Sequence, residues 1–231
     1  MIKITNTEFF GLEGALRGMR NPMNSWEYAD SYDCFCFENP DCSCYDSETD
    51  SCKCGCFAIG DNDMTLAKKL IKAGSDHRKF MRMIHVQTDV LAPLYFWKEY
   101  DTYKVGTVAN SCSTMHKIHS KEFTIDDFSH EHLISLGHLT GLSEKCLQNT
   151  IEVMNGYRQM FIETKDKKYW WQIIQLLPSS YNQLRTIDLN YEVLLNIYHA
   201  RKNHKLDEWH TFCEWIEKLP YMKDFLGLEE K

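Results

Sequence analysis

The chain lacks the features that mark membrane, secreted and disordered proteins. No segment approaches 18 uninterrupted apolar residues, so no transmembrane helix is expected. The start, MIKITNTEFFGLEG, lacks the charged beginning and the apolar run of a signal peptide. Hydrophobic residues make up 43% of the 231 residues and aromatic residues 13%, unlike the composition of disordered chains. We therefore expect a compact, soluble, cytoplasmic protein with no membrane partner.

An excess of positive charge is also missing. Lys and Arg number 26 against 33 Asp and Glu, which gives a formal net charge of -7. Proteins that coat nucleic acids draw their affinity from clustered Lys and Arg. We therefore expect no nucleic-acid partner, although the composition permits a local cationic pocket.

Cysteine is scarce outside one short stretch. Seven of the ten cysteines fall between Cys34 and Cys56, and Cys112, Cys146 and Cys213 are scattered. We interpret residues 30–60, which are also rich in Asp, Ser, Asn and Gly, as a loop insertion. Paired thiols suit a soft metal ion, but here one residue separates them where structural zinc sites have two to four. A metal site with an unknown ion, an unstructured loop and a disulfide module all stay open, and we expect the insertion to lie outside any active site.

Local patterns predict strands early and helices late. MIKITNTEF reads as an opening strand, and alternating Val86, Thr88 and Val90 predict a strand that ends at Pro93. A helix is predicted over 61–74, capped by polar residues 61–63 and ended by Gly74. Further helices are expected over 123–139, 143–164, 167–177, 187–209 and 206–220. This order indicates an α+β fold with an antiparallel or mixed sheet, in one domain over 1–231.

The stretch IDLNYEVLLNIYHAR holds three polar residues, Asn190, Asn196 and Arg201, in an expected helix. At about 100° per residue, the six-residue and five-residue steps turn by about 120° and 140°, so the three do not share one stripe. One interpretation is structural: the amides bond neighbouring backbone and Arg201 complements the dipole at the helix end.

Two segments together offer a functional interpretation. LPSSYNQLRTIDLNYEVLLNIYHAR (177–201) resembles the flavin-dependent thymidylate synthases in its Leu-Pro, short turn, Asn, second Asn six residues later and Arg five beyond. HRKFMRMIHVQTDVLAPLYFWKEYDTYKVGTVANSCST (77–114) resembles the same family from its flavin-contacting His to its signature loop. The resemblance covers residues 75–115 and 170–220.

The resemblance implies an enzyme with a defined set of ligands. It would be an FAD-dependent methyltransferase of nucleotide biosynthesis that converts dUMP to dTMP with methylenetetrahydrofolate and NADPH, as a homotetramer with active sites between subunits. Arg201 would hold the pyrimidine carbonyl, because a guanidinium stays cationic and offers planar donors. Asn190 and Asn196 would contact the flavin, since amides both donate and accept.

The signature loop departs from the family pattern. Thr102 and Tyr103 replace the first Arg and the His of Arg-His-Arg, Lys104 keeps the second cation, and a further family Arg is Ile174 here. The loss of these guanidinium groups leaves two alternatives open: a related flavoenzyme for another pyrimidine nucleotide, or a non-catalytic nucleotide- or metal-binding relative. Four other cations could compensate: Arg78, Arg82, Lys98 and Arg185.

The resemblance assigns the candidate site by position. Catalytic roles fall on Arg201 and Ser113; cofactor contacts on His77, Tyr103, Lys104, Thr107, Asn190 and Asn196; and substrate contacts on Glu99, Thr102, Asn110, Ser111, Ser113 and Arg201.

Overall fold

The computed structural model describes residues 2–33, 45–46, 51–52, 57–134 and 141–228. The chain divides into two compact units, each drawn from separate segments. Unit 1 comprises Met1–Thr7, Gln87–Asp188 and Ala200–Cys213. Unit 2 comprises Glu8–Val86, Leu189–His199 and Glu214–Lys231. The single domain expected over 1–231 stays a prediction.

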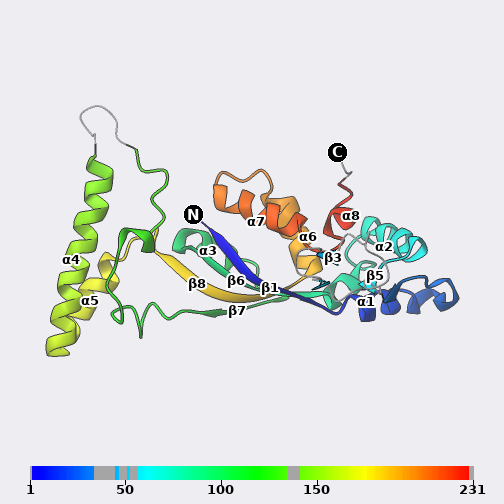
Figure 1. Cartoon of the computed structure of the whole chain (residues 1–231), viewed down its shortest axis with the longest axis horizontal. Helices are drawn as coiled ribbons and strands as arrows, with labels where there is room; N and C mark the ends of the chain where they lie inside the picture. Colours follow the sequence, from blue (N-terminus) through cyan, green and yellow to red (C-terminus); the bar gives the residue numbers. More distant parts are fainter. Residues whose placement is uncertain (1, 34–44, 47–50, 53–56, 135–140, 229–231) are drawn as a thin grey trace. The chain divides into compact units, whose positions relative to one another are not determined.

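A four-stranded sheet has the order β1-β6-β8-β7 (Figure 1). The bounds of its strands are β1 Lys3–Phe10, β6 His85–Pro93, β7 Thr107–Ser111 and β8 Asn182–Asn190. The predicted strands at both β1 and β6 are confirmed, and Val86, Thr88 and Val90 are all buried, as a period of two requires. Strands β7 and β8 were not predicted. The α+β class with a sheet and covering helices is confirmed.

In unit 1, helix α3 (Leu94–Tyr100) follows β6 directly, and α4 (Leu142–Thr164) packs against α5 (Lys167–Leu176) (Figure 1). The α4–α5 core is a cluster of Ile118, Phe123, Phe128, Ile151, Met154 and Ile173. Helices predicted over 143–164 and 167–177 are confirmed. The helix predicted from residue 123 is wrong over the described part, which holds one 3-10 turn, Ile125–Asp127, closed by a capping box of Thr124 and Asp127.

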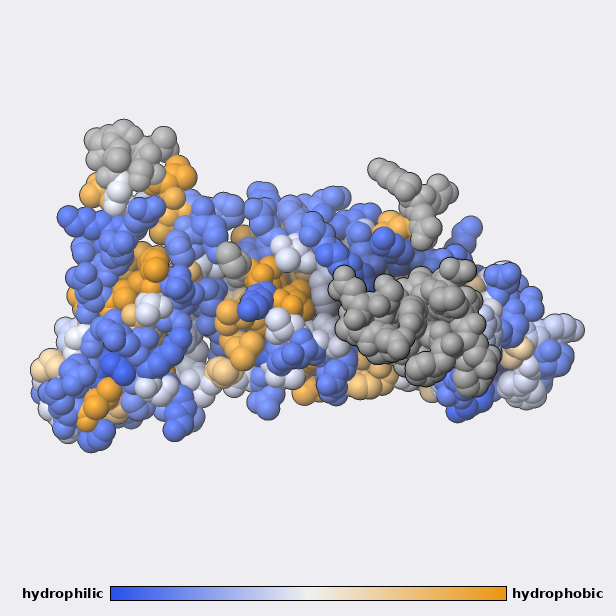
Figure 2. All heavy atoms as spheres, in the orientation of Figure 1, coloured by the Kyte–Doolittle hydropathy of each residue, from blue (hydrophilic) through white to orange (hydrophobic). Residues whose placement is uncertain are grey.

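The surface of α4 and α5 carries apolar side chains among hydrophilic ones (Figure 2). The exposed large apolar residues of these two helices are Leu142, Val153, Met160, Trp171 and Leu176. Leu142, Val153 and Leu176 also line a groove of about 470 Å³. A patch of this kind is typical of a surface that packs against another protein surface.

In unit 2, α1 (Leu12–Met19) buries Leu12, Ala15, Leu16 and Met19, one face of a helix. Gly11 begins this helix with a φ of 86°, and a Cβ there would lie 2.2 Å from the Met83 carbonyl oxygen. The position therefore requires glycine.

The predicted helix over 61–74 is confirmed as α2 (Asp61–Ala73), ended by Gly74. The predicted cap from residues 61–63 is wrong, because Gly60 occupies the N-cap position. The N–H groups of the first turn are bonded instead by a carboxylate about thirty residues away in the sequence. Asp30 accepts hydrogen bonds from the backbone N–H groups of Asn62 at 2.8 Å and Asp63 at 3.0 Å. A sequence pattern confined to one turn cannot reveal such a cap.

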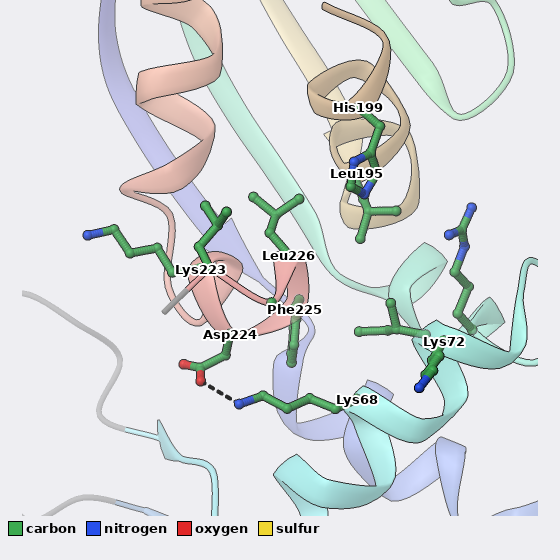
Figure 3. A pocket seen from close by; sticks show the side chains of 12 residues that line it. Lys68, Lys72, Leu195, His199, Lys223, Asp224, Phe225 and Leu226 are labelled. Carbon is green, nitrogen blue, oxygen red and sulfur yellow. Dashed lines mark hydrogen bonds and ion pairs between the residues drawn. The ribbon is translucent and has the colours of Figure 1, made fainter. Parts of the chain in front are cut away.

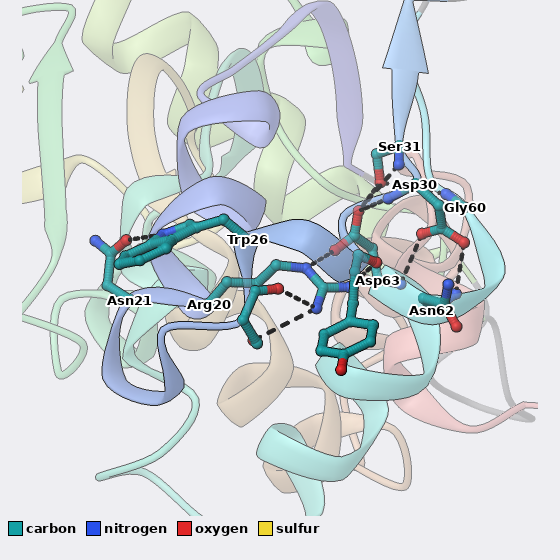
Figure 4. A network of polar contacts seen from close by, with 10 residues as sticks. Arg20, Asn21, Trp26, Asp30, Ser31, Gly60, Asn62 and Asp63 are labelled. Carbon is teal, nitrogen blue, oxygen red and sulfur yellow. Dashed lines mark hydrogen bonds and ion pairs between the residues drawn. The ribbon is translucent and has the colours of Figure 1, made fainter.

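Asp63 itself forms a buried ion pair with Arg20 (Figure 4). Arg20 Nε donates to Asp63 Oδ1 at 2.6 Å, and the two side chains are 4% and 2% exposed. Ser31 donates to the other Asp63 oxygen from its backbone N–H and its hydroxyl, at 3.0 and 2.6 Å. Burial would raise the pKa of Asp63, but the hydrogen bonds from Ser31 and Arg20 outweigh it and lower that pKa below its ordinary value.

These bonds close the base of the cysteine-rich insertion. β2 (Tyr32–Asp33) pairs antiparallel with β5 (Phe57–Ala58), and β3 (Tyr45–Asp46) pairs with β4 (Ser51–Cys52). The metal, loop and disulfide alternatives concern cysteines that, apart from Cys52, lie outside the described residues. Within the described ranges, no group of three or more His, Cys, Asp or Glu side chains could hold a metal ion. No helix in those ranges is long and apolar enough to span a membrane.

The helix predicted over 187–209 is wrong in its first part. β8 continues to Asn190, with Ile187 and Leu189 buried at strand spacing, and α6 begins only at Tyr191 and ends at Arg201. The helix predicted over 206–220 is confirmed as α7 (Asp207–Glu217), and α8 (Met222–Leu226) follows it in the chain. Asn190 therefore belongs to a strand end, whereas Asn196 and Arg201 belong to a helix.

Candidate active site

A carboxylate at the end of α3 organises the candidate site of unit 1. Glu99 Oε2 accepts a hydrogen bond from Arg201 Nη1 at 2.9 Å and another from the Trp209 indole N–H at 3.0 Å. The same oxygen lies 3.3 Å from His204 Nε2. Glu99 is 34% and Arg201 19% exposed, so the pair is accessible from solvent. One oxygen thus brings together three residues separated from it by about a hundred positions.

Two aromatic rings fix the guanidinium of Arg201 further. Arg201 Nε donates to the Tyr103 hydroxyl at 3.0 Å. The guanidinium carbon lies 4.8 Å from the Trp209 ring centroid and 5.7 Å from that of Tyr103, within cation–π range. Among the described residues, these bonds engage two of the five N–H donors of a guanidinium. The other donors are available to a planar acceptor such as a pyrimidine carbonyl.

The signature loop begins by bonding back onto α3. The Thr102 hydroxyl donates to the Glu99 carbonyl oxygen at 2.7 Å. The Thr107 hydroxyl donates to the Tyr103 carbonyl oxygen, and Gly106 between them has a φ of 75°. These bonds hold the backbone that carries both Glu99 and Tyr103. In this structure Thr102 and Thr107 position their neighbours.

The later loop residues face solvent. Ser113 Oγ accepts hydrogen bonds from the backbone N–H groups of Met115 at 3.2 Å and His116 at 2.9 Å, so it closes a turn. Its catalytic role stays a prediction. Asn110 and Ser111, which were assigned to substrate binding, are exposed, and so is Lys104, which was assigned to cofactor binding.

In unit 2, Asn190 caps the helix that follows it. Its side-chain oxygen accepts the backbone N–H of Val193 at 3.0 Å, and the residue is 7% exposed. This is the structural role of an N-cap amide. Its side-chain oxygen is thus occupied, and only its NH₂ group could donate to a ligand. The flavin contact assigned to Asn190 stays a prediction.

Asn196 joins a second charged cluster of unit 2. Arg78 Nη2 donates to Asn196 Oδ1 at 2.9 Å, and Arg78 Nε donates to Glu192 Oε1 at 3.3 Å. Arg82 also donates to the Glu192 carboxylate. Burial would raise the pKa of Glu192, but the bonds from Arg82 and Arg78 lower it, so the group is anionic at neutral pH. The oxygen of Asn196 is thereby held, which leaves its NH₂ as the donor.

The other sequence-derived candidates have simpler surroundings. His77 is exposed in the turn after α2, where its backbone N–H donates to the Gly74 carbonyl oxygen at 3.0 Å. Arg185 pairs with Asp101 at 2.6 Å and lies 4.3 Å from the Trp97 ring centroid. Arg185 is therefore committed within unit 1 rather than free to replace a lost loop arginine.

Sequence reasoning missed two members of these clusters. Glu192, which binds two arginines, was not singled out, and His204, beside Glu99, was noted only as resembling the family's continuation after the matched helix and received no role. The separations of these partners exceed a hundred residues in most cases, so no local pattern reports them. The position of His204 and Trp209 just after the matched helix was the available signal.

Comparison with known proteins identifies the fold. No family model matches the sequence, and no curated protein matches it. Thymidylate synthase X from Helicobacter pylori, solved with FAD and dUMP, matches with a TM-score of 0.64 and 14% identity over 98% of this chain and 97% of that chain. A second structure, flavin-dependent thymidylate synthase from Helicobacter pylori complexed with FAD and dUMP, gives 0.63 and 14% over 97% of both chains.

A third matching structure is that of an enzyme described by a different activity. The UMP/dUMP methylase from Streptomyces cacaoi, bound with 5-bromo-UMP, has a TM-score of 0.59 and 10% identity over 98% of this chain and 93% of that chain. The chain therefore has the fold of the flavin-dependent thymidylate synthases over nearly its whole length. It is a divergent example of that fold, and the resemblance noted in the sequence is confirmed at this level.

Proposed function

We propose that the chain is a flavin-dependent methyltransferase acting on carbon five of a pyrimidine nucleotide, with dUMP as the first candidate. The observation that carries the proposal is the arrangement of Arg201, held by Glu99 and Tyr103 in a solvent-accessible site of unit 1. The fold shared with enzymes solved with FAD and dUMP supports it. Methylenetetrahydrofolate would be the one-carbon donor and NADPH the reductant.

Arg201 would activate the pyrimidine ring electrostatically. A guanidinium held in one plane offers parallel N–H donors to a ring carbonyl oxygen and keeps its charge throughout. When the imide proton leaves, negative charge grows on that oxygen, and a donor already in place stabilises it without reorganisation. Glu99 and Tyr103 would act as positioning residues, because they orient Arg201 through its other N–H groups.

The polar residues of the matched segments fit a flavin in part. Asn196 fits best, since Arg78 fixes its amide with the NH₂ group free to donate to the isoalloxazine edge. Asn190 could add one donor from a buried cap position. His77, Tyr103, Lys104 and Thr107 would complete the contacts by resemblance. When bound and reduced by NADPH, FAD would supply the two electrons that convert the transferred methylene into a methyl group.

A homotetramer is part of the proposal. The exposed apolar residues of α4 and α5 support it, because a second copy that packs against them would remove apolar surface from water. Sedimentation of the purified chain measures this directly, and a monomer at micromolar concentration would contradict it.

A second candidate substrate is another pyrimidine nucleotide, such as UMP. The altered signature loop, in which Thr102 and Tyr103 stand where the family pattern has Arg and His, indicates that the nucleotide contacts differ from that pattern. Because UMP and dUMP carry the same phosphate, the loop does not choose between these two. The fold shared with a UMP/dUMP methylase supports UMP as a candidate. Residues Asn110, Ser111 and Ser113 would contact the nucleotide in either case.

The deciding experiment compares two arginine variants with a nearby control. Purified protein is reconstituted with FAD and incubated with dUMP or UMP, methylenetetrahydrofolate and NADPH, and methylated product is measured by mass spectrometry. Arg201→Ala should lose at least about a hundredfold in turnover, as removal of one oxyanion donor does elsewhere. Arg201→Lys should restore little, because it lacks the planar fork, whereas exposed Lys205→Ala should behave as wild type.

The outcomes separate the alternatives. Product from dUMP or from UMP identifies the nucleotide. A protein that cannot be made yellow by FAD and yields no product from either would instead be a non-catalytic relative. Full turnover by Arg201→Ala would refute the role given to that residue.

A further inference from the structure

The carboxylate of Glu99 has one oxygen that is saturated with hydrogen bonds. Oε2 accepts from Arg201 Nη1 at 2.9 Å and from the Trp209 indole N–H at 3.0 Å, and it lies 3.3 Å from His204 Nε2. The backbone N–H of Leu206 donates to His204 Nδ1 at 3.2 Å. Nδ1 is therefore an acceptor, and the proton of the neutral ring is on Nε2, facing Glu99. Three N–H donors thus converge on one oxygen and hold the carboxylate in place.

The other oxygen, Oε1, is open to a ligand. Within the described ranges, no donor bonds to Glu99 Oε1. The buried side-chain polar atoms that have no partner in those ranges are the Tyr100 hydroxyl and His119 Nδ1. Because Oε1 is not one of these buried atoms, solvent reaches it, in agreement with the 34% exposure of the Glu99 side chain. An ionised carboxylate oxygen only accepts, so a ligand that bonds to it must bring an N–H or O–H group.

Arg201 offers the complementary hydrogen-bonding groups beside it. Its Nε donates to the Tyr103 hydroxyl and its Nη1 to Glu99, while in the described part of the chain the two N–H groups of Nη2 have no acceptor. The ion pair therefore presents free donors and a free acceptor from two side chains in contact. A ring edge on which a carbonyl oxygen stands next to an N–H group matches this pair. The imide edge of uracil has that arrangement, because its N3 carries a proton between two carbonyl groups.

We propose that Glu99 determines the base specificity of the site: its Oε1 accepts a hydrogen bond from N3–H of uracil, while Arg201 donates to the adjacent carbonyl oxygen. Cytosine has an unprotonated N3, whose lone pair would face the carboxylate, so cytosine nucleotides are selected against. The resemblance placed Glu99 at the substrate by sequence position alone, whereas this contact follows from its open oxygen. This role of Glu99 rests on the proposed function, because it requires a pyrimidine held by Arg201.

A cavity in unit 2 is a second place where a nucleotide could bind. Its volume is about 790 Å³, and side chains of α2, α6 and α8 line it (Figure 3). This volume falls in the range of small-molecule sites. Neither Glu99 nor Arg201 is among its described lining residues, whereas exposed Lys72 is. Lys72→Met therefore removes a cation from the cavity and leaves the Glu99 site unchanged.

The test measures the dissociation constants of three nucleotides by calorimetry on the full chain in the presence of FAD. The nucleotides are dUMP, dCMP and 3-methyl-dUMP, in which a methyl group replaces the N3 proton, and the three ribonucleotides are measured in parallel. Glu99→Gln puts in place an amide that can donate as well as accept, and Glu99→Ala removes the group. The controls are Lys72→Met and Glu122→Gln, which removes one charge from an exposed residue of unit 1. Circular dichroism checks that each variant is folded.

The wild-type protein should bind the uracil nucleotide at least about tenfold more tightly than either analogue with the same sugar. Tenfold equals about 1.4 kcal/mol, near the lower end of what a hydrogen bond to a charged group contributes. Glu99→Gln should lose the preference over cytosine, because its amide can donate to an unprotonated N3. Glu99→Ala should lose the preference over both analogues, and both controls should keep it.

The possible failures are distinguishable. If Glu99 only positions Arg201, its variants will weaken all three nucleotides equally and keep the wild-type preference, which would overturn this role and leave the proposed function standing. Binding of dCMP as tight as that of dUMP to the wild-type protein would do the same. A preference that disappears in Lys72→Met would place the nucleotide in the cavity of unit 2 and would also overturn it. If neither dUMP nor UMP binds to the wild-type protein, the proposed function itself fails, and the role of Glu99 fails with it.

Discussion

The buried Arg20–Asp63 pair allows a stability prediction to be worked out in detail. Replacing Arg20 by Met removes the guanidinium that bonds to Asp63 at 2.6 Å and to the carbonyl oxygens of Ser25 at 3.1 Å and Tyr28 at 2.8 Å. The Asp63 carboxylate stays buried without its cation. Breaking a buried pair by removing one partner costs about 3–5 kcal/mol. That is a large share of a typical total stability of about 5–15 kcal/mol.

The prediction can be measured by thermal unfolding. In chains of this size, 1 kcal/mol moves Tm by about 2–4 °C, so Arg20→Met should lower Tm by about 6–20 °C. The matched control is Arg17→Met, three residues earlier, in the last turn of α1. Arg17 forms an ion pair with Glu13 at 3.4 Å, but the two side chains are 71% and 68% exposed, so its loss should shift Tm little.

A double variant tests the cause of the effect. Arg20→Met combined with Asp63→Asn removes the stranded charge, and it should recover part of the stability lost by Arg20→Met alone. If Arg20→Met and Arg17→Met unfold at the same temperature, the reasoning from burial fails. The reasoning also fails if the stability losses of Arg20→Met and Asp63→Asn simply add in the double variant, because additive losses would mean that the two side chains do not interact.

Three further predictions concern Asn190, Glu192 and Glu99. Asn190→Ala removes an N-cap and should lower stability by about 1 kcal/mol, measured by urea unfolding, whereas an unchanged midpoint would contradict the capping role. The pKa of Glu192 is depressed by Arg82 and Arg78 despite burial, so its stabilising contribution is complete above its unfolded pKa and is lost as pH falls through the lower folded pKa. Glu192→Gln should therefore flatten the acid side of the stability profile, and a profile identical to wild type would argue against this. Glu99→Gln keeps an acceptor but removes the charge, so it should weaken nucleotide binding more than it lowers Tm; a drop in Tm with unchanged binding would make Glu99 purely structural.

The fold was predictable where a pattern is local. The alternation of Val86, Thr88 and Val90 directly reflects which face of β6 is buried, and Gly74 ends α2 because glycine tolerates the required backbone. Both predictions needed only neighbouring residues.

The fold was not predictable where a short apolar run fits two periods. The residues from Ile187 through Ile197 suit a strand or a helix, and the chain uses both, with the change at Asn190. The pairing of β8 with β6 and β7 decides the first part, and no local signal carries that information.

The candidate site shows the same division. The spacing of Asn196 and Arg201 indicated the fold, which the solved structures confirm. The carboxylate that holds Arg201 lies 102 residues away, and its indole partner bonds the same oxygen from a third element. Such convergence arises only from tertiary packing.

The closed base of the cysteine-rich insertion has a consequence for how this protein can vary. Tyr221 donates its hydroxyl to the Phe57 carbonyl oxygen at 3.0 Å, and Asp30 and Asp63 secure the opposite side. Because β2 and β5 join the two ends of the insertion in a two-stranded ladder, the bonds that hold this base do not depend on the length of chain between Asp33 and Phe57. We therefore expect changes in that length to leave the base in place.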